Sequence, residues 1–413
     1  MRIKVIIMTS LLLGGLPMAG LAQLNELPTA TVTRPDGRRL SLGTEAFRAF
    51  QQGIRARNEG NFEPALKAFT EAIRVFPAYA QAYYERGNTY LRIKSYDQAV
   101  ADFSKVIELK APDLLVDAYN NRGFIYNEFA RKYEMAINDF TRAIQINPSY
   151  VRAYYNRALA YDRAGKSAQA IADYTKTLQL EPGYVDAFNN RGIVYLESQQ
   201  VAKALEDFNQ AVVLKPDYAL GYYNRGLAYA YQKNYDDALK NYNRAIELNP
   251  GYAEALHNRG YIYNDIRKEY DLALADFNQA LKINPEYVNA YYNRGLAHFN
   301  KQAYEAAIAD FSQVLNRNAK DADAYYYRAE SNYRVSEFDQ AILDFKQVLA
   351  LLPNDAWGHY WLARLYSLKK DLPSSLASLK TAIQLNPEFK RLAKNEADLV
   401  FLRNLAEFKQ MTQ

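Results

Sequence analysis

Small and aromatic residues return along this chain at a fixed interval of 34 positions. Residues 221–229 read Gly-Tyr-Tyr-Asn-Arg-Gly-Leu-Ala-Tyr, and nearly the same letters stand at 153–161 and 290–298. Each copy continues with a small residue, then an aromatic residue, then in most copies a proline, which ends a helix. Self-similarity at a period of this length is typical of a stack of helix pairs. The pattern therefore predicts an all-α chain over residues 46–389.

Each copy has two positions that are occupied by small residues, and we interpret them as the place where its two helices are in contact. If the first is numbered position 8, it stands in the middle of the first helix, where Gly costs up to about 1 kcal/mol compared with Ala. Its repeated use predicts that the second helix approaches closely there. The residues at position 8 are Gly53, Gly87, Gly123, Ala158, Gly192, Gly226, Gly260, Gly295, Ala329 and Ala363. The expected neighbours include Ala65, Ala99, Ala136, Ala170 and Ala204, with aromatic residues such as Phe69, Phe103, Phe140, Tyr174 and Phe208 beside them.

The spacing of Gly, Tyr, Ala, Phe or Tyr, and Pro within 34 residues resembles the tetratricopeptide repeat (TPR) family, and ten copies cover residues 46–389. The resemblance implies a right-handed α-solenoid of about ten helix-turn-helix units. Copies three and seven carry one extra residue in the turn, and copy two has a longer loop around Pro112. Residues 390–413 are expected to form one capping helix, because a final repeat has no neighbour to cover its apolar side.

The N-terminus has the features of an export signal. Arg2 and Lys4 precede an apolar run, and small residues follow up to Ala22. We expect residues 1–22 to be a signal peptide cleaved after Ala22, with an uncleaved anchor as the alternative. The exported protein would then be periplasmic or secreted, without a lipid anchor because the chain has no Cys. Residues 23–45, which hold Pro28 and Pro35, are expected to be a disordered leader.

Composition narrows the classes of function. The absence of Cys excludes disulfides, thiolate chemistry and Cys-based metal sites. The formal net charge of +5 would fall to about +3 with the signal removed, and Lys and Arg form no dense run. A nucleic-acid partner would favour clustered basic charge, so none is expected. The 36 Tyr residues are explained by their use at fixed positions of the repeat.

Arginine at position 7 varies together with an acid on the second helix. Seven of the eight copies with the Arg, such as those holding Arg191 and Arg294, have Asp before the aromatic residue, as at Asp207 and Asp310, and copy six has Asn241 there. The copies with Gln52 or Leu362 instead lack the Asp. This covariation between copies predicts an ion pair inside each repeat, where the planar guanidinium suits a carboxylate.

Asparagine occupies position 6 in six consecutive copies, although Asn is a mediocre helix residue. In the TPR fold that the resemblance implies, positions 2, 5, 6 and 9 line the concave face. The amides would then form a ladder, like that of O-GlcNAc transferases, which can bind the backbone of an extended peptide. Aromatic residues at position 5 could stack on the ligand. The predicted groove residues are Asn121, Asn156, Asn190, Asn224, Asn258, Asn293, Tyr84, Tyr155, Tyr223 and Tyr292. The alternative is that these side chains connect neighbouring repeats.

No arrangement of residues indicates catalysis, a metal or a cofactor. Residues 160–167 resemble a phosphate-binding loop, but its first Gly is missing and no strand precedes it, so a turn between helices is expected. The three His residues lie in different copies, without metal-ligand spacing. The TPR clamp that binds chaperones is matched at Asn88, Asn121 and Arg152 but not at Tyr84 and Asn156.

The leading hypothesis is therefore a non-enzymatic exported adaptor that binds peptide segments or partner proteins. A scaffold of an envelope polysaccharide synthesis or export machine is the alternative, because a Tyr-rich groove could meet sugars. An enzyme accessory region and an RNA-binding repeat fit less well.

Overall fold

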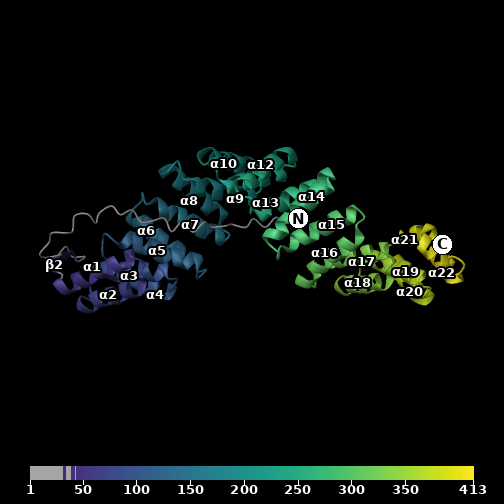
Figure 1. Ribbon diagram of the computed structural model, residues 1–413, viewed down its shortest axis with the longest axis horizontal. Coiled ribbons are helices and arrows are strands. Elements are labelled where there is room, and N and C mark those ends of the chain that lie inside the picture. Colours follow the sequence, from purple (N-terminus) through teal and green to yellow (C-terminus); the bar gives the residue numbers. More distant parts are fainter. Residues whose placement is uncertain (1–30, 34–38, 42) are drawn as a thin grey trace. The chain divides into compact units, whose positions relative to one another are not determined.

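The computed structural model describes residues 31–33, 39–41 and 43–413, most of which are helical. Contacts divide the chain into two compact units, Met1–Pro216 and Asp217–Gln413, each described by itself below. In both units, consecutive helices form antiparallel pairs whose members lie side by side (Figure 1). The prediction of an all-α chain of ten helix pairs is confirmed.

The helix pairs follow the 34-residue period in both units. The pairs of the first unit are α1 (Thr44–Asn58) with α2 (Phe62–Val75), α3 (Ala80–Arg92) with α4 (Tyr96–Glu108), α5 (Leu115–Glu128) with α6 (Tyr133–Ile146), α7 (Val151–Arg163) with α8 (Ser167–Leu180), and α9 (Val185–Glu197) with α10 (Val201–Leu214). The pairs of the second unit are α11 (Ala219–Tyr231) with α12 (Tyr235–Leu248), α13 (Ala253–Tyr261) with α14 (Tyr270–Ile283), α15 (Val288–Asn300) with α16 (Tyr304–Arg317), α17 (Ala322–Arg334) with α18 (Phe338–Leu351), and α19 (Ala356–Leu368) with α20 (Leu372–Leu385).

The glycine at position 8 lies against the aromatic residue of the second helix. A Cβ atom added at Gly192 would lie 2.7 Å from Cε1 of Phe208, which is fully buried. At Gly226 the same distance to Cε1 of Tyr242 is 2.7 Å. In the copies with glycine, the aromatic ring thus occupies the space that a Cβ atom at position 8 would need, as the repeat pattern predicted.

Each turn between the helices of a pair contains a residue in the left-handed conformation. This residue is glycine in two turns, Gly60 (φ 80°) and Gly165 (φ 72°), and another residue in the other eight, such as Lys233 (φ 60°). Gly165 belongs to the segment that resembles a phosphate-binding loop. That segment lies at the turn between α7 and α8, as expected.

The extra residue of the seventh repeat is absorbed at the end of its first helix. There α13 continues into a π-helix, η1 (Ile262–Arg267), which holds one more residue per turn than an α-helix. Lys268 then takes the left-handed conformation (φ 58°) before α14 begins. The insertion therefore changes the helix end as well as the turn, while the aromatic contact of Gly260 with Phe277 is kept.

The prediction of one capping helix over residues 390–413 is wrong. Three short segments stand there instead: α21 (Phe389–Asn395), the 3₁₀-helix η2 (Ala397–Leu402) and α22 (Ala406–Thr412). The extended backbone of Glu396 (ψ 120°) and Leu405 (ψ 135°) separates them. The breaks allow Leu399, Leu402 and Phe408 to be buried in one cluster with residues of α19 and α20. The predicted apolar residues thus do cover the last repeat.

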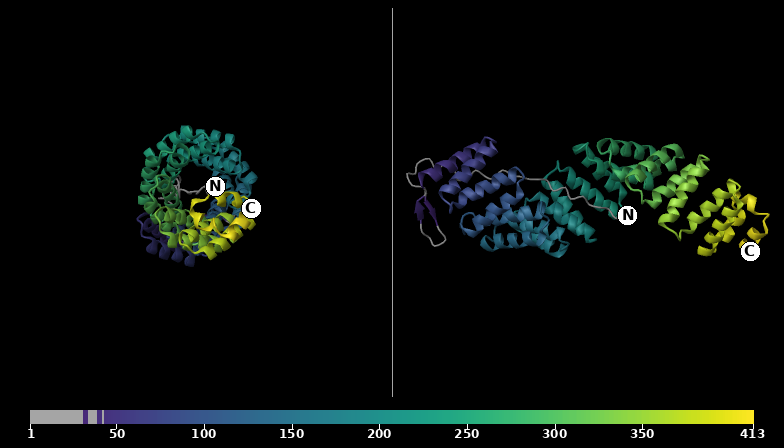
Figure 2. Two further views of the ribbon diagram at one scale, coloured as in Figure 1. Left: turned by 90° about the vertical axis from the view of Figure 1, so that its right-hand side faces the viewer. Right: turned by 90° about the horizontal axis from the view of Figure 1, so that it is seen from below.

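A small hairpin stands before the first repeat (Figure 2, right, purple). Strands β1 (Thr31–Thr33) and β2 (Arg39–Ser41) pair antiparallel, with Val32 opposite Leu40. The prediction of a disordered leader over 23–45 is therefore wrong for these six residues, whose backbone groups pair with each other, and for the start of α1. The predicted signal peptide, 1–22, lies outside the described residues.

Candidate functional site

The arginine at position 7 joins three helices. Arg191 on α9 donates from Nε and Nη2 to both carboxylate oxygens of Asp207 on α10, at 2.8 and 2.7 Å. Its Nη1 donates to Oγ1 of Thr175 on α8, in the preceding repeat, at 2.9 Å. The rings of Phe188 and Tyr195 lie on either side, each with its centroid 5.8 Å from the guanidinium carbon. The predicted pair is thus confirmed, and it belongs to a larger clamp between repeats.

The same clamp recurs in repeats two to five and seven to nine, whereas Arg225 of the sixth repeat donates to the amide oxygen of Asn241. Arg294 binds Asp310 through two hydrogen bonds of 2.9 and 2.6 Å, as predicted, and also Asn278 at 2.7 Å. The sequence reasoning missed the third partner, the small polar residue directly after the aromatic residue of the preceding repeat. The third partners so placed are Thr70, Ser104, Thr141, Thr175, Asn243, Asn278 and Ser312. Their recurrence in successive copies was the available signal.

The electrostatics of the clamp are those of a buried pair. Asp207 is 4% exposed, and burial raises the pKa of its carboxyl group, while the hydrogen bonds and charge of Arg191 act in the opposite direction. A carboxylate buried in this way needs its partner, because an uncompensated buried charge is strongly destabilising. The clamp is therefore structural and is unavailable to a ligand.

The asparagines at position 6 form hydrogen bonds between neighbouring repeats. The Nδ2 atom of Asn190 donates to the hydroxyl of Tyr155 at 2.9 Å, and that of Asn258 donates to the hydroxyl of Tyr223 at 3.1 Å. Asn121 reaches Tyr84 at 3.4 Å and Asn88 at 3.2 Å. In each case the partner belongs to the first helix of the preceding repeat. These contacts are those of the alternative interpretation, in which the ladder connects repeats.

Two further asparagines of the ladder also contact the first helix of the preceding repeat, but their partners are not tyrosines. Asn156 donates to Oδ1 of Asn120 at 3.0 Å, and Nδ2 of Asn293 lies 2.8 Å from Nε2 of His257. His257 is 3% exposed, and burial lowers its pKa to about 4, so the ring is neutral near pH 7. This histidine serves packing and hydrogen bonding between repeats, as expected of an isolated His.

Exposure separates the predicted groove residues into two groups. Asn224, Asn293, Tyr84 and Tyr223 are buried, with exposed fractions between 1% and 8%. Their prediction as residues that line a groove is wrong, because close packing of neighbouring first helices covers them. The half-buried residues are Asn121, Asn156, Asn190, Asn258, Tyr155 and Tyr292. For these six the groove role stays a prediction.

The ladder changes at the ninth repeat. Position 6 is Tyr327 there, and its ring lies 6.2 Å from that of Tyr292, edge to face, and 5.7 Å from that of Phe311, nearly parallel. Among the described residues, the hydroxyl of Tyr292 has no hydrogen-bond partner. One repeat later the hydrogen bond returns, since Nε1 of Trp361 donates to the hydroxyl of Tyr326 at 2.7 Å. The first-helix side of repeats eight and nine is thus held by ring packing.

A second arginine arrangement ties the cap to the last repeats. Arg364 on α19 donates to Oδ2 of Asp398 on η2 at 2.8 Å, and its guanidinium carbon lies 4.0 Å from the ring centroid of Trp361. The hydroxyl of Tyr333 donates to the same carboxylate oxygen at 2.7 Å. This site could not be predicted from the repeat pattern, because Arg364 stands outside position 7 and the cap lies outside the repeat.

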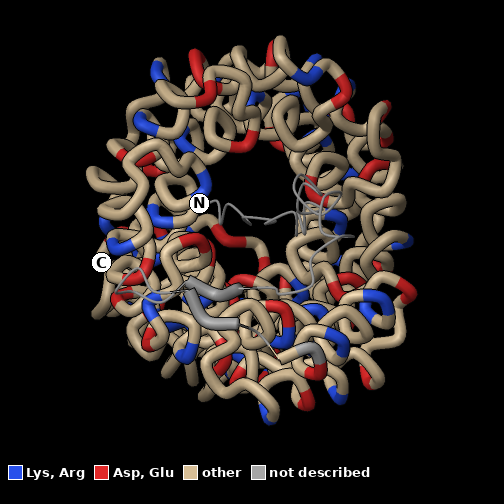
Figure 3. The backbone as a smooth tube through the Cα atoms, turned by 90° about the vertical axis from the view of Figure 1, so that its left-hand side faces the viewer, with Lys and Arg blue, Asp and Glu red and all other residues tan. Residues whose placement is uncertain are grey.

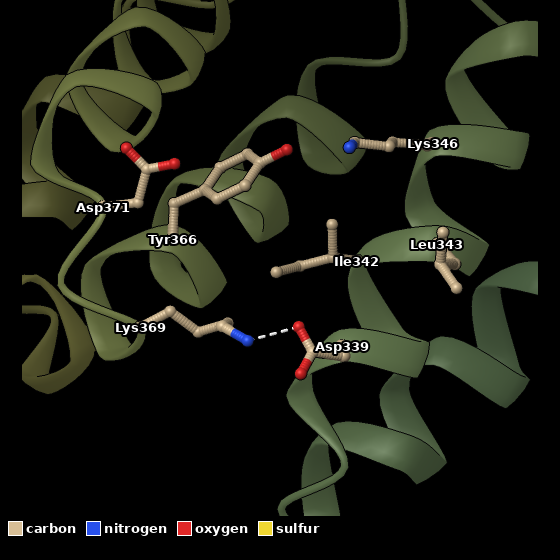
Figure 4. Close-up of a pocket in the computed structure, with 7 residues that line it drawn as sticks. All are labelled: Asp339, Ile342, Leu343, Lys346, Tyr366, Lys369 and Asp371. Carbon is tan, nitrogen blue, oxygen red and sulfur yellow. Dashed lines mark hydrogen bonds and ion pairs between the residues drawn. The ribbon is translucent and has the colours of Figure 1, made fainter.

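An open cleft of about 340 Å³ lies between α18 and the turn from α19 to α20 (Figure 4). Tyr366 and Ile342 form its apolar side, and Lys369 pairs with Asp339 at its edge. The tenth repeat has Leu362 where eight other copies have an arginine, and Lys346 takes the place of the small polar partner. The cleft therefore marks the junction at which the arginine clamp is missing.

The described residues offer no other chemical site. Within them, no group of three or more His, Asp or Glu side chains could hold a metal ion. No helix in the part of the chain that the structure describes is long and apolar enough to cross a membrane. Positive and negative residues are interspersed along the backbone (Figure 3). Stacked helix pairs without a catalytic constellation define the class as a helical-repeat protein.

Comparison with known families agrees with this class. Models described as tetratricopeptide repeat or TPR repeat match residues 50–113, 132–184, 194–302 and 304–356. The chain belongs to the tetratricopeptide repeat family. Proteins with this fold are typically interaction scaffolds.

Curated relatives match over short stretches only. The chain is 33% identical to human mitochondrial import receptor subunit TOM70 over 87 residues, which are 20% of this chain and 14% of that protein. It is 34% identical to human serine/threonine-protein phosphatase 5 over 81 residues, 20% of this chain and 16% of that protein. The chain thus spans less than a fifth of the length of these relatives.

Solved structures show the same architecture. The C-terminal part of a TPR repeat-containing protein from Cytophaga hutchinsonii covers 59% of this chain and 98% of its own, with a TM-score of 0.50 and 21% identity. YrrB, described as a TPR protein with an unusual peptide-binding site, covers 47% of this chain and 99% of its own, at a TM-score of 0.41 and 24% identity. At these identities the likeness concerns the fold alone.

Proposed function

We propose that this protein is an exported, non-enzymatic adaptor that holds extended segments of partner proteins against the first helices of its repeats. Its family and fold support the coarser role of a scaffold for protein interactions. One observation carries the finer proposal. The second helices bury their Ala and Phe residues against the first helices of the same repeats. The first helices also keep half-buried polar and aromatic side chains, such as Asn190 and Asn258, at successive repeats.

The hydrogen bonds of the ladder reduce the number of side-chain donors and acceptors that this surface can offer to a peptide. The Nδ2 groups of Asn190 and Asn258 are engaged with tyrosines of the preceding repeat. A carboxamide has two N–H donors and an acceptor oxygen, so such a side chain can still bind a peptide with its remaining groups. Affinity should therefore come from several weak contacts along the repeats, each contributing about 0.5–1.5 kcal/mol.

Photo-crosslinking in intact cells tests the binding role. A crosslinking amino acid at Asn190 or Asn258 on a first helix should capture a partner protein. The same amino acid at Lys240, an exposed residue of the second helix α12, should capture much less. Equal labelling from both helices, or capture of glycan in place of protein, would contradict the proposal; the second result would favour the polysaccharide scaffold.

Export is tested separately. Mass spectrometry of the protein isolated from its native cell should find an N-terminus near Gln23, because the small residues before it suit signal cleavage. A protein that retains Met1 and remains in the cytosol would contradict the exported role without affecting the binding role.

A further inference from the structure

Repeats seven to nine hold a patch of aromatic rings and carboxylates on their first helices. Its members, which we name the aromatic–acidic patch, are Tyr261, Asp265, Tyr292, Asp323, Tyr327 and Glu330. Asp323 is exposed, and the other five are half-buried. All six belong to the second unit and to the side of the repeats that the proposed function assigns to partners.

Helix spacing and a ring contact bring members of the patch close together. Asp323 and Tyr327 stand four residues apart on α17, and so do Tyr261 and Asp265 at the end of α13 and in η1. Burial raises the pKa of Tyr292, and Asp323 and Asp265 raise it further. Burial, Asp323, Glu330 and Asp265 likewise raise the pKa of Tyr327. The rings of Tyr292 and Tyr327 are 6.2 Å apart. Asp265 from the seventh repeat and Asp323 from the ninth thus act on the same pair of phenols.

The patch coincides with the interruption of the ladder. Within the second unit, other junctions between first helices are closed by a side-chain hydrogen bond, as in Asn258 to Tyr223 and Trp361 to Tyr326. Where Tyr327 replaces the asparagine, the hydroxyl of Tyr292 is left without a hydrogen-bond partner among the described residues. At this junction the rings pack against each other, but no described residue supplies a hydrogen bond to this hydroxyl.

The negative charge of the patch is only partly balanced. Glu330 pairs with Arg334 at 3.3 Å. Asp265 accepts a neutral hydrogen bond from Asn264 at 2.6 Å, and Asp323 has no ion pair or hydrogen bond within the described part of the chain. Asp265 and Asp323 thus have no ion pair with a cation in the described part of the chain. Aromatic faces and carboxylates both attract a Lys or Arg side chain.

We infer that the aromatic–acidic patch binds a lysine or arginine side chain of an extended partner segment, which lies against the rings of Tyr292 and Tyr327 and pairs with Asp265 and Asp323. The inference rests on the proposed function and names the chemistry of its partner. The basic side chain supplies the positive charge that this surface lacks, and its alkyl stem can cover the rings.

Fluorescence anisotropy with two labelled peptides, (Ser-Lys-Gly)4 and (Ser-Gln-Gly)4, tests the inference on the full mature chain. The lysine peptide should bind more tightly than the glutamine peptide. In the Asp265→Asn/Asp323→Asn variant its affinity should fall about fivefold to thirtyfold, the effect of losing two partly exposed charge contacts. The affinity of the glutamine peptide should stay within about twofold.

A matched control variant separates the effect of the patch on peptide affinity from the effect of net charge. Glu305→Gln/Glu337→Gln removes two exposed carboxylates from the second-helix side of the eighth and ninth repeats and changes the net charge equally. The affinity of this control variant for the lysine peptide should stay within about twofold of that of the unaltered protein. Tyr327→Asn should also weaken the binding of the lysine peptide, because it removes one of the two rings and its new amide can form a hydrogen bond with the hydroxyl of Tyr292.

Two results would overturn the inference. One is an equal loss in the Asp265→Asn/Asp323→Asn variant and in its control; the other is no preference for the lysine peptide. If the crosslinking experiment still captures a partner protein with the Asp265→Asn/Asp323→Asn variant, the adaptor role survives and only its basic selectivity fails. The absence of any crosslinked partner would instead contradict the adaptor role.

Discussion

Removing one clamp arginine should weaken one repeat strongly. In Arg191→Leu, the carboxylate of Asp207 keeps its burial but loses two hydrogen bonds and its counter-charge, and Thr175 loses a third bond. Breaking a buried ion pair typically costs about 3–5 kcal/mol. The side chain of Arg191 is 15% exposed, so water can partly replace it. We therefore expect a loss of about 2–4 kcal/mol.

The loss should be local, because each repeat of a solenoid contacts only its neighbours. Hydrogen exchange measured by mass spectrometry should show faster exchange in α8, α9 and α10, with little change in α1 to α4. Urea unfolding followed by circular dichroism should begin at lower urea. Global unfolding of such an array need not be two-state, so the local free energy of unfolding is obtained from the exchange data and not from the urea curve.

Two further variants control the interpretation. Arg74→Leu removes an arginine from an exposed pair with Glu71 and should cost less than about 1 kcal/mol. Arg191→Leu/Asp207→Ser gives the fifth helix pair the residues that the tenth repeat has at these two positions, Leu362 and Ser378, and should recover most of the loss. If Arg191→Leu costs no more than Arg74→Leu, the burial argument is refuted.

The pH dependence has a defined sign. The folded-state pKa of Asp207 is raised above its ordinary value, and it should rise further when Arg191 is absent. A carboxyl group with a raised folded-state pKa loses stability as pH rises through the range between its unfolded and folded values. The deficit of Arg191→Leu should therefore be larger at pH 7 than at pH 4.

Three other predictions follow from the same packing. Gly192→Ala should cost about 1–3 kcal/mol of unfolding free energy in urea titration, because the new Cβ overlaps the ring of Phe208, whereas Gly183→Ala, with no atom within 4 Å, should be nearly neutral. His257 has its pKa lowered to about 4, so its contribution to stability is complete above pH 6.5 and is lost as pH falls from 6.5 to 4, by up to about 3 kcal/mol. His257→Asn should reduce this loss in melting curves recorded across that range, and an unchanged pH profile would show that the ring is solvated. Asn258→Ala should lower the melting temperature by removing its hydrogen bond, worth about 0.5–1.5 kcal/mol, and an unchanged or raised melting temperature would contradict its role between repeats.

The sequence by itself determined the repeat and most of what lies inside one repeat. Because one unit is written ten times, covariation between copies acts like an alignment, and it identified the pair of Arg191 with Asp207. The glycine at position 8 and its aromatic neighbour were predictable for the same reason, since their contact spans only the two helices of one pair.

Contacts between repeats were decided only by the tertiary structure. A position in the sequence does not say whether Asn258 meets a ligand or Tyr223, because both lie on the same side of the helix. The third partner of the arginine clamp belongs to the preceding repeat, and the cap is broken at Glu396 so that Asp398 can reach Arg364. Such contacts depend on the rotation from one helix pair to the next, which packing of side chains sets and a linear period does not contain.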